Sequence, residues 1–274
     1  MIDYPIRSNL FRYQVEPGEH LCGHRSQFQQ IDIYNTPCFG KMLLLDGHIQ
    51  LSELDEAAYH EALVHIPALS IPELRRALVI GAGDGGVLRE LCKHESLEAI
   101  DMVEIDRDVV DLCRKHLPEL ADGAFDDPRV KLKIADATEF VQESQDWYDL
   151  IVLDVTDSYE EDPSLSEEIF GEEFYSKLAA MLAIEGMVVT QADNPVFCPY
   201  SQQQISELYG KYFPVVHSYW ALVPSFGGFS GFVVGSKGAQ LAPTWHGLRP
   251  APISTRYLSR ATYDLALSPL PFAR

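Results

Sequence analysis

The sequence predicts an α/β fold in which a parallel sheet with helices on both faces follows a small N-terminal β domain. Hairpin-like patterns fill the first part of the chain, to about residue 54. Strand-like and helix-like patterns then alternate, as they do in a parallel sheet covered on both faces. Acidic or glycine-rich residues follow several of these strands. Sheets of this kind bind ligands at the carboxyl ends of their strands.

The N-terminal part consists of short predicted strands. Residues 28–34 (FQQIDIY) alternate in polarity, as a half-buried strand does. Residues 41–45 and 48–51 lie on either side of Asp46-Gly47, which is a strong hairpin signal. Two or three hairpins make a sheet too small to be stable alone. We therefore expect the hairpins to form a small domain beside a larger one.

The predicted boundary between the two domains lies at residues 54 and 55, which gives domains of residues 1–54 and 55–274. Residues 57–66 look helical, and we expect Pro67 to end this helix. Strands and helices then follow in alternation. The predicted strands are 77–80, 99–105, 130–135, 148–153 and 187–191, and the predicted helices are 88–94, 109–116 and 172–182.

The composition narrows the classes of partner. Of the 274 residues, 46% are hydrophobic, enough for a full core without disulfides or metals. The formal charge of −20 argues against nucleic acid, which needs a basic surface. A negative field suits a cationic ligand, although acidic charge also simply keeps a protein soluble.

The cysteines and the absence of targeting patterns favour a cytoplasmic protein. The five cysteines form no CxxC pair and have no histidines at zinc-finger spacing, which points to reduced thiols. The N-terminal residues contain no charged segment followed by an apolar run, so no signal peptide is expected. No stretch approaches the length of a membrane span.

The segment 81–86 (GAGDGG) follows a predicted strand and opens a helix. Glycines there let the backbone turn tightly and approach a ligand closely, so we expect Gly81 and Gly83 to contact one. The pattern fits GxGxxG, which dinucleotide-binding and S-adenosylmethionine-binding proteins share. A plain turn between strand and helix is the ordinary alternative.

Two carboxylates follow the next two strands. Glu104 lies about twenty residues beyond the glycines, where a carboxylate can accept hydrogen bonds from both ribose hydroxyls. Capping of the next helix is the alternative, but Asp106 is better placed for that. Asp136 ends the third strand, where its carboxylate can accept a hydrogen bond from an adenine amino group. These strand ends favour an adenosine with free ribose hydroxyls.

Asp84 distinguishes between the two ligand classes. An acidic residue in the glycine loop would repel a pyrophosphate, whereas it would attract a sulfonium or an ammonium group. Asp84 therefore favours an S-adenosyl compound over NAD.

Asp154 and Asp157 leave the fourth strand three residues apart and can face one cleft. A primary amine is protonated at neutral pH and is then no nucleophile. Transfer of a group to such an amine therefore needs a carboxylate that binds the ammonium and accepts its proton. For these residues taken alone, turn capping is the more ordinary interpretation.

Further motifs occur in order over nearly the whole chain: 26–31 (SQFQQI), 39–50 (FGKMLLLDGHIQ), 55–61 (DEAAYHE), 81–90 (GAGDGGVLRE), 103–106 (VEID), 126–130 (DDPRV), 154–157 (DVTD) and 255–258 (TRYL), with Pro-Phe at 271–272. Jointly they resemble the spermidine synthase family of polyamine aminopropyltransferases. The resemblance implies a small N-terminal β domain ahead of a class I S-adenosylmethionine methyltransferase-like, Rossmann-like domain. It also implies a homodimer or homotetramer.

The resemblance implies an activity and a role for each matching residue. The enzyme would move the aminopropyl group of decarboxylated S-adenosylmethionine to a polyamine and release methylthioadenosine, without a prosthetic group or a metal. The donor and this product would be held by Gln29, Asp84, Glu104, Asp136 and Ala137. Asp154 would be the general base, and the acceptor channel would be lined by Tyr59, His60, Asp157 and, near it, Gln191. Taken alone, Tyr59, His60 and Gln29 would be ordinary structural residues.

The sequence departs from the family at three places. Residues 158–163 (SYEEDP) replace the usual Pro-x-Gly-Pro of a gating loop, and residues 223–226 (VPSF) replace a Pro-Thr-Tyr. The second segment resembles that of thermospermine synthases, and Phe226 lacks the hydroxyl that helps to hold the acceptor. Ala137 replaces a glycine. The first two changes raise the hypothesis of a triamine acceptor such as spermidine, against putrescine with a merely solvated acidic loop.

Three rival functions stay open from the sequence. An S-adenosylmethionine methyltransferase would share the donor half, because fold does not imply function. An NAD(P)-linked dehydrogenase is disfavoured by Asp84. A non-catalytic polyamine-binding protein would share the acidic residues but lack turnover.

Overall fold

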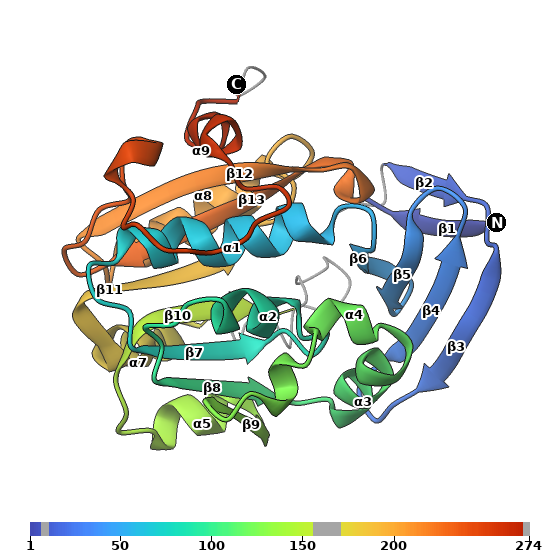
Figure 1. The fold of residues 1–274 in the computed structure, drawn as a ribbon, viewed down its shortest axis with the longest axis horizontal. Coiled ribbons are helices and arrows are strands. Elements are labelled where there is room, and N and C mark those ends of the chain that lie inside the picture. The colour runs from blue at the N-terminus through green and yellow to red at the C-terminus, as the bar shows by residue number, and fades with distance from the viewer. Residues whose placement is uncertain (7–10, 156–170, 271–274) are drawn as a thin grey trace.

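The structure is a computed structural model that describes residues 1–6, 11–155 and 171–270. Within them, three sheets lie along the chain. The largest has seven strands in the order β12-β13-β11-β10-β7-β8-β9. The sheets of two and four strands both come from the N-terminal part and lie together at one end of the molecule (Figure 1).

The N-terminal sheets are antiparallel, as their hairpin patterns predict. Their strands are β1 (Ile2–Pro5), β2 (Arg12–Val15), β3 (Glu19–Arg25), β4 (Gln30–Thr36), β5 (Gly40–Leu45) and β6 (His48–Ser52). Asp46 and Gly47 join β5 to β6 with positive φ angles of 47° and 80°, which matches the right-handed twist of a tight hairpin. The prediction of a turn at this dipeptide is confirmed.

Five adjacent strands of the seven-stranded sheet run parallel to one another, in the order β11, β10, β7, β8 and β9. Its strands are β7 (Arg76–Gly81), β8 (Ala99–Glu104), β9 (Val130–Ile134), β10 (Tyr148–Asp154), β11 (Leu182–Gln191), β12 (Val215–Val223) and β13 (Gly228–Ser236). The last two strands run antiparallel to their neighbours. The sequence patterns do not predict this antiparallel pair.

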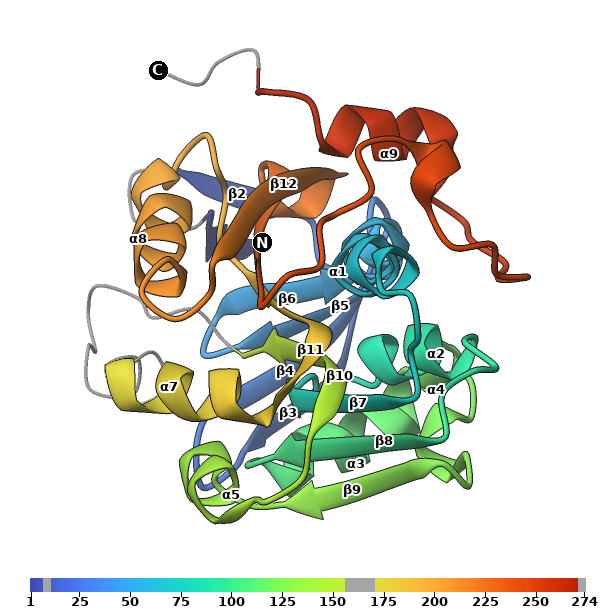
Figure 2. The same cartoon turned by 90° about the vertical axis from the view of Figure 1, so that its left-hand side faces the viewer.

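Helices cover both faces of this sheet (Figure 2), which confirms the predicted fold class. They are α1 (Glu56–Ser70), α2 (Gly86–Cys92), α3 (Arg107–His116), α4 (Pro118–Ala121), α5 (Ala137–Glu143), α7 (Glu172–Met181), α8 (Pro199–Tyr209) and α9 (Arg260–Ala266), with short 3-10 turns η1 (Ala124–Asp126), η2 (Pro224–Phe226) and η3 (Trp245–Gly247). Alternate strand residues bury opposite faces: Val79 and Val152 pack in the cluster of α1 and α2, whereas Leu78 and Ile151 pack in that of α7 and α8. Period-two alternation of this kind is what a sheet buried on both sides requires.

One helix boundary differs from the prediction. Pro67 was expected to end α1, but the helix continues to Ser70. Proline removes one backbone donor and hinders the turn before it, yet here it lies in the last turn, where little helix remains to be lost. Buried apolar packing of this turn, including Ala68 and Leu69, stabilises it.

The N-terminal strands pack directly on the larger part of the chain. Ile31 and Leu43 share a buried cluster with Val109 and Cys113 of α3. In Figure 1 the arrows of β7 and β8 point toward the four-stranded sheet. The carboxyl ends of the parallel strands, where a ligand is expected, therefore face this sheet. The division into domains of residues 1–54 and 55–274 stays a prediction.

The structure describes all five cysteines, and none of them forms a disulfide. Among the residues that the structure describes, no helix is both long enough and apolar enough to cross a membrane.

Candidate active site

The glycine loop lies directly against the end of β10. Gly81 has φ of +80°, and a Cβ there would lie 2.1 Å from the carbonyl oxygen of Asp154. Only glycine combines this conformation with so close an approach. The amide of Ala82 donates to the same oxygen over 2.9 Å. The loop therefore fixes the backbone of Asp154 at the carboxyl edge of the sheet.

Glu104 lies beside the loop at its second glycine. A Cβ on Gly83 would come within 3.0 Å of Glu104 Oε2, so the carboxylate and the loop are in close contact. The amide of Asp106 donates to Glu104 Oε1 over 2.9 Å. Burial raises the pKa of Glu104 to about 7, against the lowering effect of that amide. A ligand that donates hydrogen bonds to the ionised carboxylate would favour its deprotonation.

Gln29 reaches this end of the site from the N-terminal sheet. Its side-chain amide donates to Asp106 Oδ2 over 3.0 Å, and the hydroxyl of Ser26 donates to the same oxygen over 2.6 Å. Asp106 also caps α3, since its side chain accepts from the amide of Asp108. The N-terminal strands thus supply one wall beside Glu104.

Asp136 and Ala137 lie at the end of the next strand. The amide of Ala135 donates to the carbonyl of Glu104 over 3.0 Å, which joins the ends of β8 and β9. Asp136 is exposed and caps α5, its Oδ1 accepting from the amide of Thr138 over 2.7 Å. Ala137 is the first residue of that helix. Both residues are at the predicted edge, and their predicted contact with an adenine stays a prediction.

Asp84, His60 and Asp154 converge at the centre of this edge. One ligand atom of each lies within 4.8 Å of the others. Two carboxylates and one ring nitrogen can hold a divalent metal ion or an organic ammonium group. The convergence of Asp84 from the glycine loop with Asp154 from β10 makes this end of the sheet a candidate cation site.

The Asp84 carboxylate is held by the residues behind it. Its Oδ1 accepts from the amide of Gly86 over 2.6 Å and lies 3.6 Å from Nε2 of His60. Burial acts to raise the pKa of Asp84, but the nearby His60 and the amide of Gly86 outweigh it, so the pKa lies below its ordinary value. Asp84 is therefore an anion at neutral pH.

His60 lies behind Asp84 rather than at an open surface. Only 1% of its side chain is exposed, and its Nδ1 lies 2.8 Å from Glu56 Oε2. Its ring also packs on Gly86, where a Cβ would come within 2.3 Å of it. The role of His60 in an acceptor channel stays a prediction, and its Nε2 faces the carboxylate of Asp84.

Tyr59 is the direct partner of Asp154. Its hydroxyl donates to Asp154 Oδ1 over 2.5 Å. The tyrosine ring packs edge-to-face on Phe226, with 5.6 Å between centroids, and at 5.6 Å from Phe232. These rings restrict the tyrosine, so the hydroxyl is held on the carboxylate.

Gln191 lies at the end of the neighbouring strand β11. Its side-chain amide donates to the carbonyl of Val155, next to Asp154, over 3.3 Å, and its Oε1 accepts from the amide of Asp193 over 3.0 Å. Gln191 is thus brought to the same edge as Asp154. Asp157 and the acidic loop of residues 158–163 lie outside the described residues.

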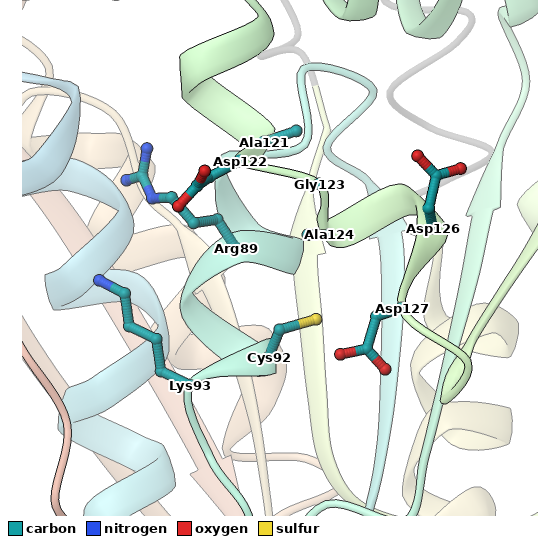
Figure 3. A pocket seen from close by; sticks show the side chains of 9 residues that line it. All are labelled: Arg89, Cys92, Lys93, Ala121, Asp122, Gly123, Ala124, Asp126 and Asp127. Carbon is teal, nitrogen blue, oxygen red and sulfur yellow. The ribbon is translucent and has the colours of Figure 1, made fainter.

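A separate cavity of about 340 Å³ lies between α2 and the segment after α4 (Figure 3). It is lined by Arg89, Cys92, Lys93, residues 121–124, Asp126 and Asp127. None of the predicted site residues lines it. This cavity is therefore separate from the point where Asp84 and Asp154 converge.

Comparison with known families decides the class of this site. The model of the spermine/spermidine synthase domain matches residues 56–243, and that of the spermidine synthase tetramerisation domain matches residues 9–53. The chain belongs to the spermidine synthase family. It is an aminopropyltransferase, and the resemblance inferred from the motifs is confirmed.

Relatives and solved structures agree with this assignment. A polyamine aminopropyltransferase of Pyrobaculum calidifontis is 39% identical over 239 residues, covering 86% of this chain and 81% of the relative. That of Moorella thermoacetica is 38% identical over 262 residues, covering 95% and 90%. A spermidine synthase in complex with the transition state analogue AdoDATO superimposes with a TM-score of 0.90 at 27% identity, over 99% of this chain and 92% of the other. The spermidine synthase of Thermotoga maritima gives 0.88 at 27% identity, over 99% and 91%.

The sequence predicts no role for Glu56 and Asp55, which open the 55–61 motif of this spermidine synthase family member, although the first contacts His60 and the second Ser225. Glu56 bonds to His60 one helical turn later, and the i, i+4 spacing of an acid and a histidine was the available signal. Asp55 accepts from both the amide and the hydroxyl of Ser225 over 2.7 and 2.8 Å, which fixes the turn that carries Phe226. Its partner lies 170 residues away, and local pattern gives no sign of it.

Proposed function

We propose that this aminopropyltransferase takes its aminopropyl group from decarboxylated S-adenosylmethionine and transfers it to a primary amine of a polyamine. The observation that carries the proposal is the convergence of Asp84 and Asp154 on one point at the end of the sheet. One carboxylate would bind the ammonium of the donor, and the other the amine of the acceptor. A structural relative in complex with a transition state analogue supports the presence of such a site in this fold.

The donor would lie along the carboxyl ends of β7, β8 and β9. Gly81 and Gly83 allow the close approach of its sulfonium end, and Glu104 would accept from the ribose hydroxyls. The adenine would lie toward Asp136 and Ala137. Gln29, which bonds to Asp106 next to Glu104, would contact the donor from the N-terminal sheet.

Asp154 would act as the general base. The acceptor amine enters as an ammonium and loses its proton to Asp154 as its nitrogen attacks the methylene carbon next to sulfur. A carbon–nitrogen bond forms, the carbon–sulfur bond breaks, and its electron pair returns to sulfur. The leaving group is a neutral thioether, which needs neither a proton nor a Lewis acid. A positioned base contributes roughly 10²- to 10⁴-fold in such steps.

Orientation of the two substrates would supply the rest of the rate enhancement. Tyr59 holds one oxygen of Asp154 in place. Gln191 bonds to the carbonyl after Asp154, and its side chain would border the acceptor. Asp157, three residues after Asp154, would bind the acceptor as well.

For the acceptor we propose a polyamine longer than putrescine, with spermidine as the candidate. Phe226 packs on Tyr59 at this site. Its ring can contact the methylene groups of a polyamine, but it has no hydroxyl to bind an ammonium group. The acidic residues 160–162 would then pair with the further ammonium groups of the polyamine. Putrescine is the competing acceptor.

Turnover of putrescine and spermidine with the same donor tests this choice. We expect spermidine to give the higher kcat/KM in the wild type, and Phe226→Tyr to shift the ratio toward putrescine. A clear preference of the wild type for putrescine would reject the triamine acceptor and leave aminopropyl transfer intact.

A methyltransferase reaction is the second candidate, since the donor half of the fold serves both. S-Adenosylmethionine carries a carboxylate that decarboxylated S-adenosylmethionine lacks, and the Asp84 anion would repel it. Offering each donor in turn separates the two reactions. Methyl transfer from S-adenosylmethionine without aminopropyl transfer would reject the proposal.

We also propose that the enzyme is a homodimer or homotetramer in the cytoplasm. The match of residues 9–53 to a tetramerisation domain supports the assembly, and five cysteines that form no disulfide support a reducing compartment. Light scattering of the purified protein would measure the assembly.

A further inference from the structure

Glu56 is a buried carboxylate that contacts two arginines and a histidine. It opens α1, and only 4% of its side chain is exposed. Arg89 donates to both of its oxygens, over 3.2 and 2.8 Å. Arg256 donates to its Oε1, and His60 lies 2.8 Å from its Oε2. A buried carboxylate with this many partners has one defined orientation.

His60 connects Glu56 to the donor site. Its Nδ1 faces Glu56 and its Nε2 faces Asp84 at 3.6 Å. Both neighbours are acceptors, so the arrangement is satisfied when both ring nitrogens carry protons. Glu56 thereby sets the ring orientation, and the ring sets the position of Asp84.

Asp84 is held on one side only. Its Oδ1 takes the amide of Gly86 and faces His60. Among the described residues, no donor bonds to Oδ2. This oxygen is the one available to a ligand ammonium, and its direction depends on the contacts to Oδ1.

The C-terminal segment 254–258 is docked on the same helix. Glu61, which is fully buried, accepts from the amides of Arg256, Tyr257 and Leu258 over 2.6, 2.8 and 2.6 Å. These bonds carry the Arg256 side chain to Glu56. The Arg256 side chain is 60% exposed and that of Glu56 only 4%, so the arginine lies on the solvent side of this carboxylate.

We propose that Glu56 is a positioning residue for the aminopropyl donor. It orients His60, which in turn orients the carboxylate of Asp84, and Arg256 of the C-terminal segment holds Glu56 in place. The inference rests on the proposed function of Asp84 as the site of the donor's ammonium. Arg256 lies 200 residues from Glu56 in the sequence, so a remote segment of the chain contributes to donor selectivity.

A pair of ligands separates positioning from general stability. Decarboxylated S-adenosylmethionine carries the ammonium, whereas methylthioadenosine has the same nucleoside without it. Calorimetric binding of both would be measured for the full-length wild type, Glu56→Gln and Arg256→Ala. Arg260→Ala is the matched control, since Arg260 is an exposed arginine of the same C-terminal region that faces Asp264 instead.

We expect Glu56→Gln to weaken donor binding roughly tenfold and Arg256→Ala roughly threefold, the effects expected when a hydrogen bond to a charged group is lost or loosened. Methylthioadenosine affinity should change by less than about twofold, and the donor KM should rise more than kcat falls. Equal weakening of both ligands, or an unchanged preference for the donor, would overturn the inference. If Glu56→Gln does not fold, the surface variant Arg256→Ala decides by the same comparison.

The wild type distinguishes failure of the inference from failure of the proposed function. A wild type that transfers aminopropyl groups and prefers the donor to methylthioadenosine, with variants that keep this preference, rejects only the role of Glu56. A wild type without such a preference rejects the ammonium site at Asp84, and the inference with it.

Discussion

The hydroxyl of Tyr59 lies 2.5 Å from Oδ1 of Asp154, although the two residues are 95 positions apart in the sequence. One comes from the first helix of the larger part of the chain, and the other from the end of its central strand β10. The bond orients the carboxylate that we propose as the general base. It also predicts how a minimal change should affect turnover.

Tyr59→Phe keeps the ring that packs on Phe226 and Phe232 and removes only the hydroxyl. A hydrogen bond to a charged group contributes about 1.5–3 kcal/mol, so we expect kcat to fall roughly tenfold or more while donor affinity is kept. Steady-state release of methylthioadenosine measures this. Tyr219→Phe is the control, because it also removes a buried hydroxyl, here bonded to the carbonyl of Ala62. Equal turnover in the two variants would show that the Tyr59 bond is not used in catalysis.

Donor-side binding should depend on the ionisation of Glu104. Burial raises its pKa to about 7, and ribose hydroxyls donate to the ionised form. Methylthioadenosine affinity should therefore rise with pH, by roughly tenfold between pH 6 and 8, in proportion to the ionised fraction. Calorimetry at the two pH values checks it. Glu104→Gln should bind weakly with a flat profile, and a wild-type affinity that falls as pH rises would contradict this role.

The buried pair His65 and His94 should make the fold sensitive to mild acid. Burial, with the charge of His65, lowers the pKa of His94 to about 3. The unfolded chain binds a proton there below about pH 6.5 and the folded chain does not, so the free energy of unfolding falls as pH drops from about 6.5. Nearby Glu90 has a lowered pKa, and its own effect begins only below about pH 4.5.

Urea unfolding at pH 7 and pH 5 tests this linkage. The wild type and His94→Gln would be compared, since groups away from the cluster of His65, Glu90 and His94 titrate equally in both. We expect the variant to lose less of its free energy of unfolding between the two pH values than the wild type. Equal losses would show that His94 is not the group responsible.

Gly86→Ala should disturb the donor site through His60. A Cβ at this position would lie within 2.3 Å of the buried ring, so the histidine must move and its contact with Asp84 must change. Alanine favours a helix by about 1 kcal/mol over glycine, hence without the clash the change would stabilise α2. We expect lower thermal stability and weaker binding of decarboxylated S-adenosylmethionine. Gly210→Ala at the end of α8, where φ is −60°, is the control that should leave both unchanged.

The predictable part of this molecule is the part governed by local rules. The glycine loop, Glu104 and Asp154 could be placed at one edge because the carboxyl ends of parallel strands always meet there. The Asp46-Gly47 hairpin followed from turn chemistry alone. In each case the residues that specify the feature are neighbours in the sequence.

The rest depended on contacts between distant segments. β12 and β13 pair antiparallel on a parallel sheet, and the buried pattern of β12 does not alternate cleanly, so its sequence gives no clear strand signal. α1 continues past Pro67 because tertiary packing outweighs a local breaker. The contact of Arg256 with Glu56 joins residues 200 positions apart, and the burial of His60 behind Asp84 follows from how α1 packs on α2.

The most direct test of the account is methylthioadenosine release from decarboxylated S-adenosylmethionine by the wild type and by Asp154→Asn, with putrescine and spermidine as separate acceptors. Asparagine keeps the shape but takes no proton, so we expect turnover by the wild type and a loss of roughly 10²- to 10⁴-fold in the variant, with donor binding retained. Asp146→Asn, an exposed aspartate before β10, should leave turnover unchanged. Full turnover by Asp154→Asn, or none by the wild type with either amine, would contradict aminopropyl transfer with Asp154 as its base.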